Sequence, residues 1–286
     1  MAALKIACAK LGLVIIDGIQ SSRLTPGLVE ILSRGDGAPF DSHVSIERIE
    51  PRAEFTTKQI ANAITALGLA HGTVVAATPL EIWTQLIAEQ GTRAVTGTKL
   101  NITDAVTFPM AINAVKGQDA VITYGVAMAK STGVAPYGVT DAQTVPTTAL
   151  LDAVYRLGDV TINTSMSPVK SINIDFGYQA RFQHGEGIWP ILCYIEQSQP
   201  LITIETELPT ALSTLTVSGS DDIIGFTLAK RAQGGGLAGS GDLVFATHVQ
   251  LVMPDVFSGG LDDLVVTSIR CRPVFDGTNN PITLTA

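Results

Sequence analysis

The chain has 286 residues, of which 46% are hydrophobic and only 15% are charged, and its mean hydropathy is +0.32. This composition is typical of a globular protein, and no apolar run approaches the roughly 20 residues of a membrane-spanning helix. The net charge of −8 is uneven: residues 1–146 carry 11 Lys and Arg against 12 Asp and Glu, and residues 147–286 carry 7 against 14. The acidic second half argues against nucleic-acid binding, which needs cations to replace the counterions of the phosphates.

The small share of charged residues also bears on association. About a quarter of an average globular chain is charged, well above the 15% found here. A chain so poor in charge has either an unusually large core or surface that is covered by other subunits. We therefore expect an oligomer.

The first half contains two predicted helices and one clear strand. Residues 56–68 place Ile60, Ile64 and Leu67 on one helical face before Gly68. Residues 78–91 begin with the capping box TPLE and continue with apolar residues at helical spacing, so we predict a second helix there. Residues 121–127 alternate between the two faces of a strand, and residues 148–157 at the centre of the chain favour a helix over a strand.

The second half consists mostly of predicted strands. In residues 172–182 six apolar residues recur at period two, which predicts one long half-buried strand or the arm of a hairpin. Its polar face carries Asn173, Asp175, Gln179 and Arg181. Further strands are predicted at residues 223–229, 243–251 and 265–271, and residues 209–217 form the counterpart of the first-half helix.

Short similarities relate the two halves. Residues 11–16 (LGLVII) match residues 157–162 (LGDVTI), and the segment 46–51 matches the segment 195–200 at an offset of 149. The offset stays between 145 and 150 along the chain. Such self-similarity at a nearly constant offset is the mark of a duplicated unit. We therefore predict a mainly β chain with two tandem β-sandwich or barrel domains, 1–146 and 147–286, each with a short α-helix.

Catalytic and metal-binding patterns are absent from the sequence. The four histidines lie in unrelated contexts without metal-ligand spacing, the three cysteines are scattered, and no GxSxG elbow is present. Paired acids at 221–222 and 262–263 point to opposite faces if they lie on strands. We expect neither an enzyme nor a bound cofactor or metal.

The second half resembles the tail tube proteins of long-tailed bacteriophages and contractile injection systems. The resemblance rests on an ordered series of segments: 160–163 (VTIN), 172–177 (INIDFG), 185–190 (GEGIWP), 200–206 (PLITIET) and 275–282 (FDGTNNPI). It covers most of residues 157–286 and extends faintly to residues 11–145 through the repeat. It implies a β-sandwich whose sheets continue from subunit to subunit, so that rings form and their inner strands enclose a lumen for DNA or a tape-measure protein.

The resemblance also assigns expected roles to residues and partners. It implies that Asn173, Asp175, Gln179 and Arg181 line the lumen, where few cations let DNA pass without specific binding. The turn at residues 276–281 is expected near a subunit contact, through Asp276, Gly277, Asn280 and Pro281. The partners would be further copies of the chain and other tail proteins (tape measure, baseplate, terminator), in a virion assembled in the host cytoplasm and without membrane insertion.

Two arrangements of the ring and two rival functions stay open at this point. Three chains with two domains each could form a pseudo-six-fold ring, or six chains could form a ring with the second domains outside. A different virion component, such as a baseplate hub, tail terminator or capsid decoration, would form a discrete oligomer. A tandem sandwich with enzymatic or carbohydrate-binding activity would need a pocket or an aromatic platform, for which only Trp83 and Trp189 are available.

Overall fold

The computed structural model describes residues 3–33, 43–69, 73–75, 78–87, 93–146, 154–163, 165–196, 199–206, 222–231, 241–258, 266–274 and 282–285. In this part of the chain the fold is mainly β, with antiparallel sheets and one short helix, α1 (Ile60–Leu67). The mainly β prediction is therefore confirmed. Among these residues no helix has the length and apolar character needed to cross a bilayer.

The strands of the two halves are as follows. The first half contains β1 (Ala3–Leu11), β2 (Val14–Ile16), β3 (Ile19–Thr25), β4 (Leu28–Ser33), β5 (His43–Ile49), β6 (Arg52–Thr57), β7 (Thr73–Val75), β8 (Leu80–Ile87), β9 (Arg93–Ile102), β10 (Ala105–Val115), β11 (Val121–Met128) and β12 (Tyr137–Thr144). The second half contains β13 (Val154–Ile162), β14 (Ser165–Met166), β15 (Val169–Asp175), β16 (Gln179–His184), β17 (Pro190–Glu196), β18 (Leu201–Thr206), β19 (Asp222–Arg231), β20 (Leu243–Ser258), β21 (Val266–Pro273) and β22 (Thr283–Thr285).

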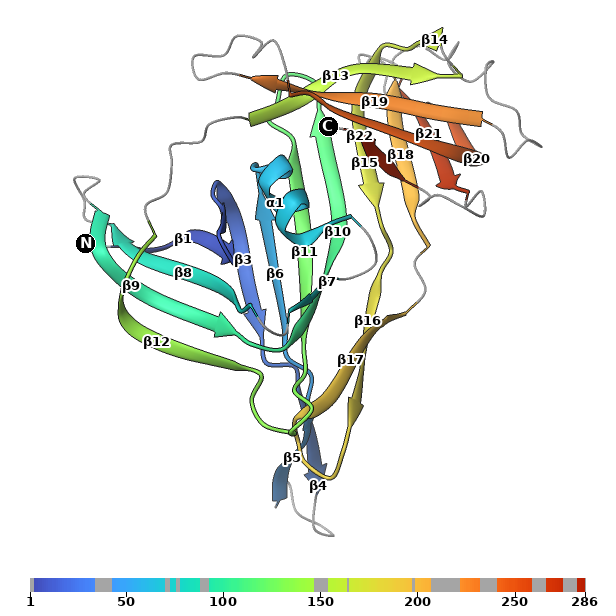
Figure 1. Ribbon diagram of the computed structural model, residues 1–286. Helices are drawn as coiled ribbons and strands as arrows, with labels where there is room; N and C mark the ends of the chain where they lie inside the picture. The colour runs from blue at the N-terminus through green and yellow to red at the C-terminus, as the bar shows by residue number, and fades with distance from the viewer. Residues whose placement is uncertain are drawn as a thin grey trace.

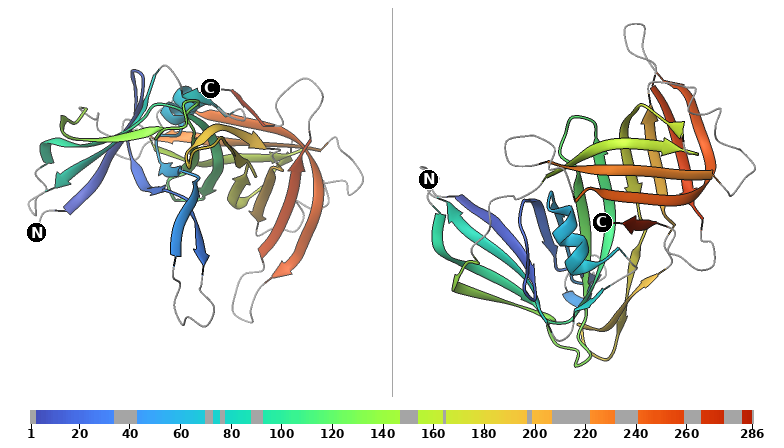
Figure 2. Two further views of the ribbon diagram at one scale, coloured as in Figure 1. Left: turned by 90° about the horizontal axis from the view of Figure 1, so that it is seen from below. Right: turned by 45° about the horizontal axis from the view of Figure 1, so that its top comes forward.

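The largest sheet runs through both halves of the chain. Its strand order is β14-β13-β19-β20-β21-β18-β15-β10-β11-β6-β3, with β22 beside β20 and β7 beside β10. A second sheet has the order β12-β9-β8-β1-β2, and β4-β5 and β16-β17 form separate hairpins. Figures 1 and 2 show β13 and β19 crossing over β15 and β18, so the large sheet folds back on itself as a sandwich.

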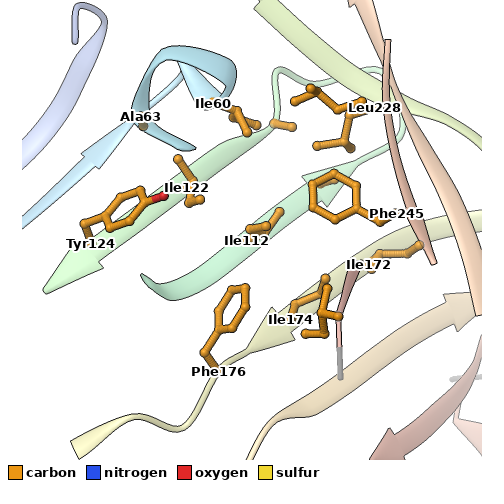
Figure 3. Packing of buried hydrophobic residues seen from close by; sticks show 14 of the residues in the cluster. Ile60, Ala63, Ile112, Ile122, Tyr124, Ile172, Ile174, Phe176, Leu228 and Phe245 are labelled. Atoms are coloured by element: carbon orange, nitrogen blue, oxygen red, sulfur yellow. The ribbon is translucent and has the colours of Figure 1, made fainter. Parts of the chain in front are cut away.

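A shared core lies between these layers. Figure 3 shows Ile112 and Ile122 of the first half next to Ile172 and Ile174 of the second, and all four side chains have no exposed surface. Burying a side chain of this size contributes about 1.5–3 kcal/mol of stabilisation. The apolar faces of the two halves are therefore packed as one continuous cluster.

The helix α1 covers the first-half part of this core. Ile60 and Leu67 are fully buried, as the sequence predicts, together with Ala63, whereas the predicted Ile64 is half-buried. The helix ends at Gly68, whose carbonyl accepts a hydrogen bond of 2.8 Å from the Tyr124 hydroxyl. The predicted start at residue 56 is wrong, because Thr56 and Thr57 still belong to β6.

The predicted helix at residues 78–91 is wrong. Residues 80–87 of this segment form β8, which pairs with β1 on one side and β9 on the other. Leu80 and Ile82 enter the core, whereas Trp83 lies on the opposite face under the Lys99 ammonium, 5.3 Å from its ring centre. Two neighbouring strands satisfy the backbone of the segment, and tertiary pairing of this kind overrides a local helix signal.

Two further predictions need correction. Residues 154–157, expected to be the end of a helix, belong to β13 and pair with β19. The predicted long strand at 172–182 is two strands in different sheets, because the chain bends at Phe176–Tyr178 between β15 and β16. The strands predicted near residues 121–127, 223–229, 243–251 and 265–271 are confirmed as β11, β19, β20 and β21. The predicted helix at 209–217 lies outside the described residues.

The two halves share the same order of strand pairings. In the first half β2, β1, β8, β9 and β12 pair in that order, and β14, β13, β19, β20 and β22 do so in the second. Likewise β3-β6-β11-β10 corresponds to β15-β18-β21-β20. The N-terminal part of β20 therefore corresponds to β9, and its C-terminal part corresponds to β10. In the first half Thr103 and Asp104 separate these two strands. The domain boundary at residue 146 is not tested by this correspondence and stays a prediction.

Candidate assembly site

The junction between the two halves is a pairing of sheet edges. Strand β10 pairs with β15 through residues 111–115 and 171–175, with Ile112 opposite Ile174. The pairing is extended at both ends, where the Lys116 N–H donates to the Lys170 carbonyl at 2.8 Å and the Phe176 N–H donates to the Met110 carbonyl at 2.9 Å. Two units of four strands are thus joined side by side into one sheet (Figure 1).

The hairpin β16–β17 strengthens this junction. It belongs to the second half but packs on β10 and β11 of the first, where Ala180 and Cys193 join a second apolar cluster with Phe108, Ala127 and Ala129. The Cys193 thiol donates to the Ala127 carbonyl at 3.3 Å. The hairpin therefore covers a face of the first-half sheet that would otherwise expose apolar surface.

A tight bend sends the chain from β15 into this hairpin. Gly177 has φ of +64°, and its N–H donates to the Asp175 carboxylate at 2.9 Å. A Cβ at this position would lie 2.6 Å from the Gln199 carbonyl oxygen. Glycine is therefore required for both its backbone conformation and the close approach of the neighbouring chain.

Asp119 connects the halves electrostatically. Its carboxylate lies 3.0 Å from the Lys58 Nζ and 3.2 Å from the Arg156 Nε, so a first-half turn is tied to a second-half strand. The hydrogen bond from Lys58 and that from Arg156 lower the pKa of Asp119 and outweigh the effect of partial burial, which raises it. The adjacent Ala120 N–H donates to the Tyr155 carbonyl at 2.7 Å.

The polar face of the large sheet carries two of the predicted lumen residues. Asn173 is exposed and lies in a cross-strand row with Asn113, Thr203 and Arg270. Asp175 is exposed on the same face of β15, since its neighbour Ile174 points into the core. Directly opposed residues share a face, so the row runs across four strands from both halves.

The other two predicted lumen residues lie on a different strand. Gln179 and Arg181 belong to β16 and are exposed, and the Arg181 guanidinium donates to Glu196 at 2.7 Å. They line a cavity of about 470 Å³ together with Arg23, Arg52 and Glu54. A neighbouring cavity of about 310 Å³ is lined by Asn173 and Asp175, and Glu54, Met110 and Tyr178 belong to both linings. The four residues are therefore neighbours, but they do not form one row on one strand.

The charge of the polar face differs from the expectation of few cations. Arg23, Arg52 and Arg270 are exposed there, and so are Glu54 and Asp175. Glu205 adds a further carboxylate, which accepts a hydrogen bond of 2.8 Å from the Ser171 hydroxyl. The surface carries both signs of charge, and the acidic balance of the second half is not concentrated on it.

Within the stretch β3-β6-β11-β10-β15-β18-β21-β20 of the large sheet, the edge at each end has a partner on one side only in the described part of the chain. Strand β3 pairs with β6 and ends the sheet, and residues 251–258 of β20 pair only with β21. Leu24 on β3 is 38% exposed, whereas the corresponding Ile174 on β15 has no exposed surface. Exposed edges of this kind offer unpaired backbone groups to another chain.

Metal-ligating residues are not clustered in the described part of the chain. No cluster of three or more His, Cys, Asp or Glu residues is placed to hold a metal among them. Burial raises the pKa of Cys8 to about 12, of Cys193 to about 11 and of Cys271 to about 12, so these thiols stay protonated at neutral pH.

Sequence reasoning missed most of this junction. Neither β3, β10 nor Asp119 was singled out, although the apolar alternation of Ile112 and Ala114 was available as a signal. The predicted contact residues Asp276, Gly277, Asn280 and Pro281 lie outside the described residues. Compared with known proteins, the chain matches no family model and no curated protein sequence.

Proposed function

We propose that this chain is a structural subunit of a bacteriophage tail tube, which assembles into stacked rings around a lumen for DNA. One observation carries the proposal: two units with the same strand order are joined edge to edge within the chain, and each outer edge of the joined pair is open in the described residues. A repeated unit that continues its sheet into the next unit suits a closed ring, in which no edge stays exposed.

The polar face supports the same function. Asn173, Asp175 and the cross-strand neighbours of Asn173 form a hydrated surface of mixed charge, and on our proposal this surface faces the lumen. DNA affinity rises with each phosphate that a cation neutralises. Acidic groups between the arginines offset that attraction, so DNA passes without specific binding. The proposed partners are further copies of the chain and the other tail proteins, in a virion assembled in the host cytoplasm.

Sedimentation combined with negative-stain electron microscopy at rising protein concentration tests the proposal. Long tubes or stacked rings with a central hole are the expected result. A single discrete ring that never stacks would favour another virion component. A monomer at every concentration would overturn the structural role and favour a binding module or enzyme.

A further inference from the structure

We propose that the free edge of β3 pairs with residues 255–258 at the end of β20 from a second copy of the chain, in the register of the internal β10·β15 pairing. This inference rests on the proposed function and names the surfaces through which one subunit meets the next. The internal junction serves as the template, because both outer edges have an equivalent strand that is already paired inside the chain.

The first step is the equivalence of β3 and β15. In β3, Ile19 pairs with Thr57 and Ser21 with Thr56, so one residue is skipped. In β15, Val169 pairs with Thr206 and Ser171 with Glu205, and the skipped residue lies 150 positions after that of β3. Since β-bulges interrupt a ladder at defined places, a shared bulge fixes the alignment of the two strands. The second side of β15 is occupied by β10.

The second step is the equivalence of β10 and the C-terminal part of β20. Pro109 pairs with Tyr124 on β11, and Pro254 pairs with Ile269 on β21. Both residues of the second pair lie 145 positions after their counterparts in the first. The next aligned pairs are Ala111 with Thr123 and Asp255 with Ser268. The register shifts differ in place: β10 shifts directly after Pro109, whereas β20 shifts between Leu251 and Met253 and again between Asp255 and Ser258, so the alignment rests on the partners on β11 and β21. Position 255 therefore stands for position 111, which pairs with Asp175 in the internal junction.

The third step is what the free surface exposes. The β15 residues Ile172 and Ile174 are fully buried in the internal junction, whereas the equivalent Ser22 is half-buried and Leu24 is 38% exposed. Covering Leu24 in a second junction would remove apolar surface from water.

A charged residue gives independent support. Arg156, which binds Asp119 across the internal junction, pairs with Ala229 on β19, and Lys5 pairs with Gln85 on β8. Both pairs lie one position before the residue at which the first strand shifts register, Ile6 in β1 and Leu157 in β13, so they correspond 151 positions apart on the first strand and 144 on the second. The strand pairings therefore do not follow the sequence match that aligns Leu11 with Leu157. Lys5 is exposed, so the first half carries a cation at the position that corresponds to Arg156, which binds Asp119 in the internal junction.

The resulting contact is head-to-tail, because one edge of each chain meets the opposite edge of the next. A contact of this type forms a ring when the rotation closes, and a helical filament when it does not. The rotation across the new junction equals that across the internal one. Each chain then contributes two similar units to the wall of the ring.

Cysteine cross-linking tests the register. Thr25 takes the place of Asp175, so Thr25→Cys and Asp255→Cys in one chain should form a disulfide between neighbouring chains on mild oxidation. Opposed residues of antiparallel strands have Cα atoms about 4.5–5.5 Å apart, within the range that a disulfide bridges. The native thiols are buried and give little background. The matched control is Thr25→Cys with Val244→Cys, an exposed position at the other end of β20.

The expected result on a non-reducing gel is a ladder of covalent dimers and larger species for the Thr25 and Asp255 pair, and monomer for the control. A second variant, Leu24→Arg, should keep the circular dichroism spectrum of the wild type. Its critical concentration for assembly should be at least tenfold higher than that of the wild type. Leu13→Arg, at a position that is 97% exposed in a turn, should assemble normally.

Each outcome decides the inference. Cross-links at the predicted pair together with loss of assembly in Leu24→Arg support the junction. A Thr25→Cys and Asp255→Cys variant that forms rings without the predicted cross-link, or a Leu24→Arg variant that assembles normally, would overturn the junction and leave the tail tube proposal standing. A wild-type chain that stays monomeric would overturn both.

Discussion

At the scale of single residues, the contact between the halves depends on a few groups whose surroundings are well defined. Asp119 is bound by two cations from different halves, and Gly177 occupies a bend that other residues enter only with strain. Asp119 belongs to no sequence motif, whereas Gly177 is the last residue of the segment 172–177 (INIDFG). Their roles follow from the positions of Lys58, Arg156 and Gln199, which lie 20 or more positions away along the chain.

Asp119→Asn should lower the free energy of unfolding by about 1–2 kcal/mol at neutral pH, because two charge-assisted hydrogen bonds are weakened. The folded-state pKa of Asp119 is lowered, so its contribution is complete above the ordinary pKa of 3.8 and is lost as the pH falls through the lowered value. Chemical denaturation of wild type and variant at several pH values measures this.

The control for this variant is Asp104→Asn, whose carboxylate lies 3.8 Å from Lys130 within the first half and is more exposed. It should change stability by less than about 0.5 kcal/mol. A difference between wild type and Asp119→Asn that stays constant at acidic pH would contradict the assigned role of the carboxylate.

Gly177→Ala should destabilise the chain by about 1–3 kcal/mol, since it combines a positive φ with a contact of 2.6 Å to the Gln199 carbonyl. Gly185→Ala is the matched control, because its Cβ would meet only the Ile191 side chain at 3.5 Å. Thermal unfolding monitored by circular dichroism compares the two. Equal melting temperatures would show that the bend at residue 177 is not constrained as described.

At the scale of elements, the equivalent strands β3 and β15 differ in the burial of their apolar side chains, and that difference is measurable. Ile174→Ala on β15 should cost about 2–5 kcal/mol, because it leaves a cavity in the shared core. Leu24→Ala at the equivalent position of β3 should cost less than about 1 kcal/mol in the monomer, since this side chain is 38% exposed. Urea denaturation at low protein concentration checks both values, and similar losses would contradict the proposed free edge.

Sequence patterns predicted well those elements in which the spacing of apolar residues matches the spacing of buried positions in the structure. Residues 243–252 of β20 and 267–271 of β21 alternate regularly between buried and more exposed positions, and α1 has a buried stripe at helical spacing. The segment 78–91 has an equally good helix signal, yet β1 and β9 pair with its first residues and make it a strand. Non-local pairing of this kind leaves no local trace. For the same reason the β10·β15 junction could not be predicted, although the offset of the repeat pointed to two related units.

At the scale of the whole molecule, the low share of charged residues is better explained by a repeated unit with open sheet edges than by a large core. One apolar cluster serves both halves, and exposed apolar residues remain at several strands, among them Leu24, Val139 and Val244. A chain with little charge and open sheet edges is prone to uncontrolled association unless those edges are paired. A ring satisfies this requirement with the contact that the chain already contains.

End-on two-dimensional averages from electron cryomicroscopy of the purified chain, with the number of chains per ring counted by native mass spectrometry, test the central claim most directly. The predicted result is a closed ring with a central hole and twice as many similar wall units as chains. A compact oligomer without a hole, or a wall with one unit per chain and the second half outside it, would contradict the claim that both halves occupy equivalent places.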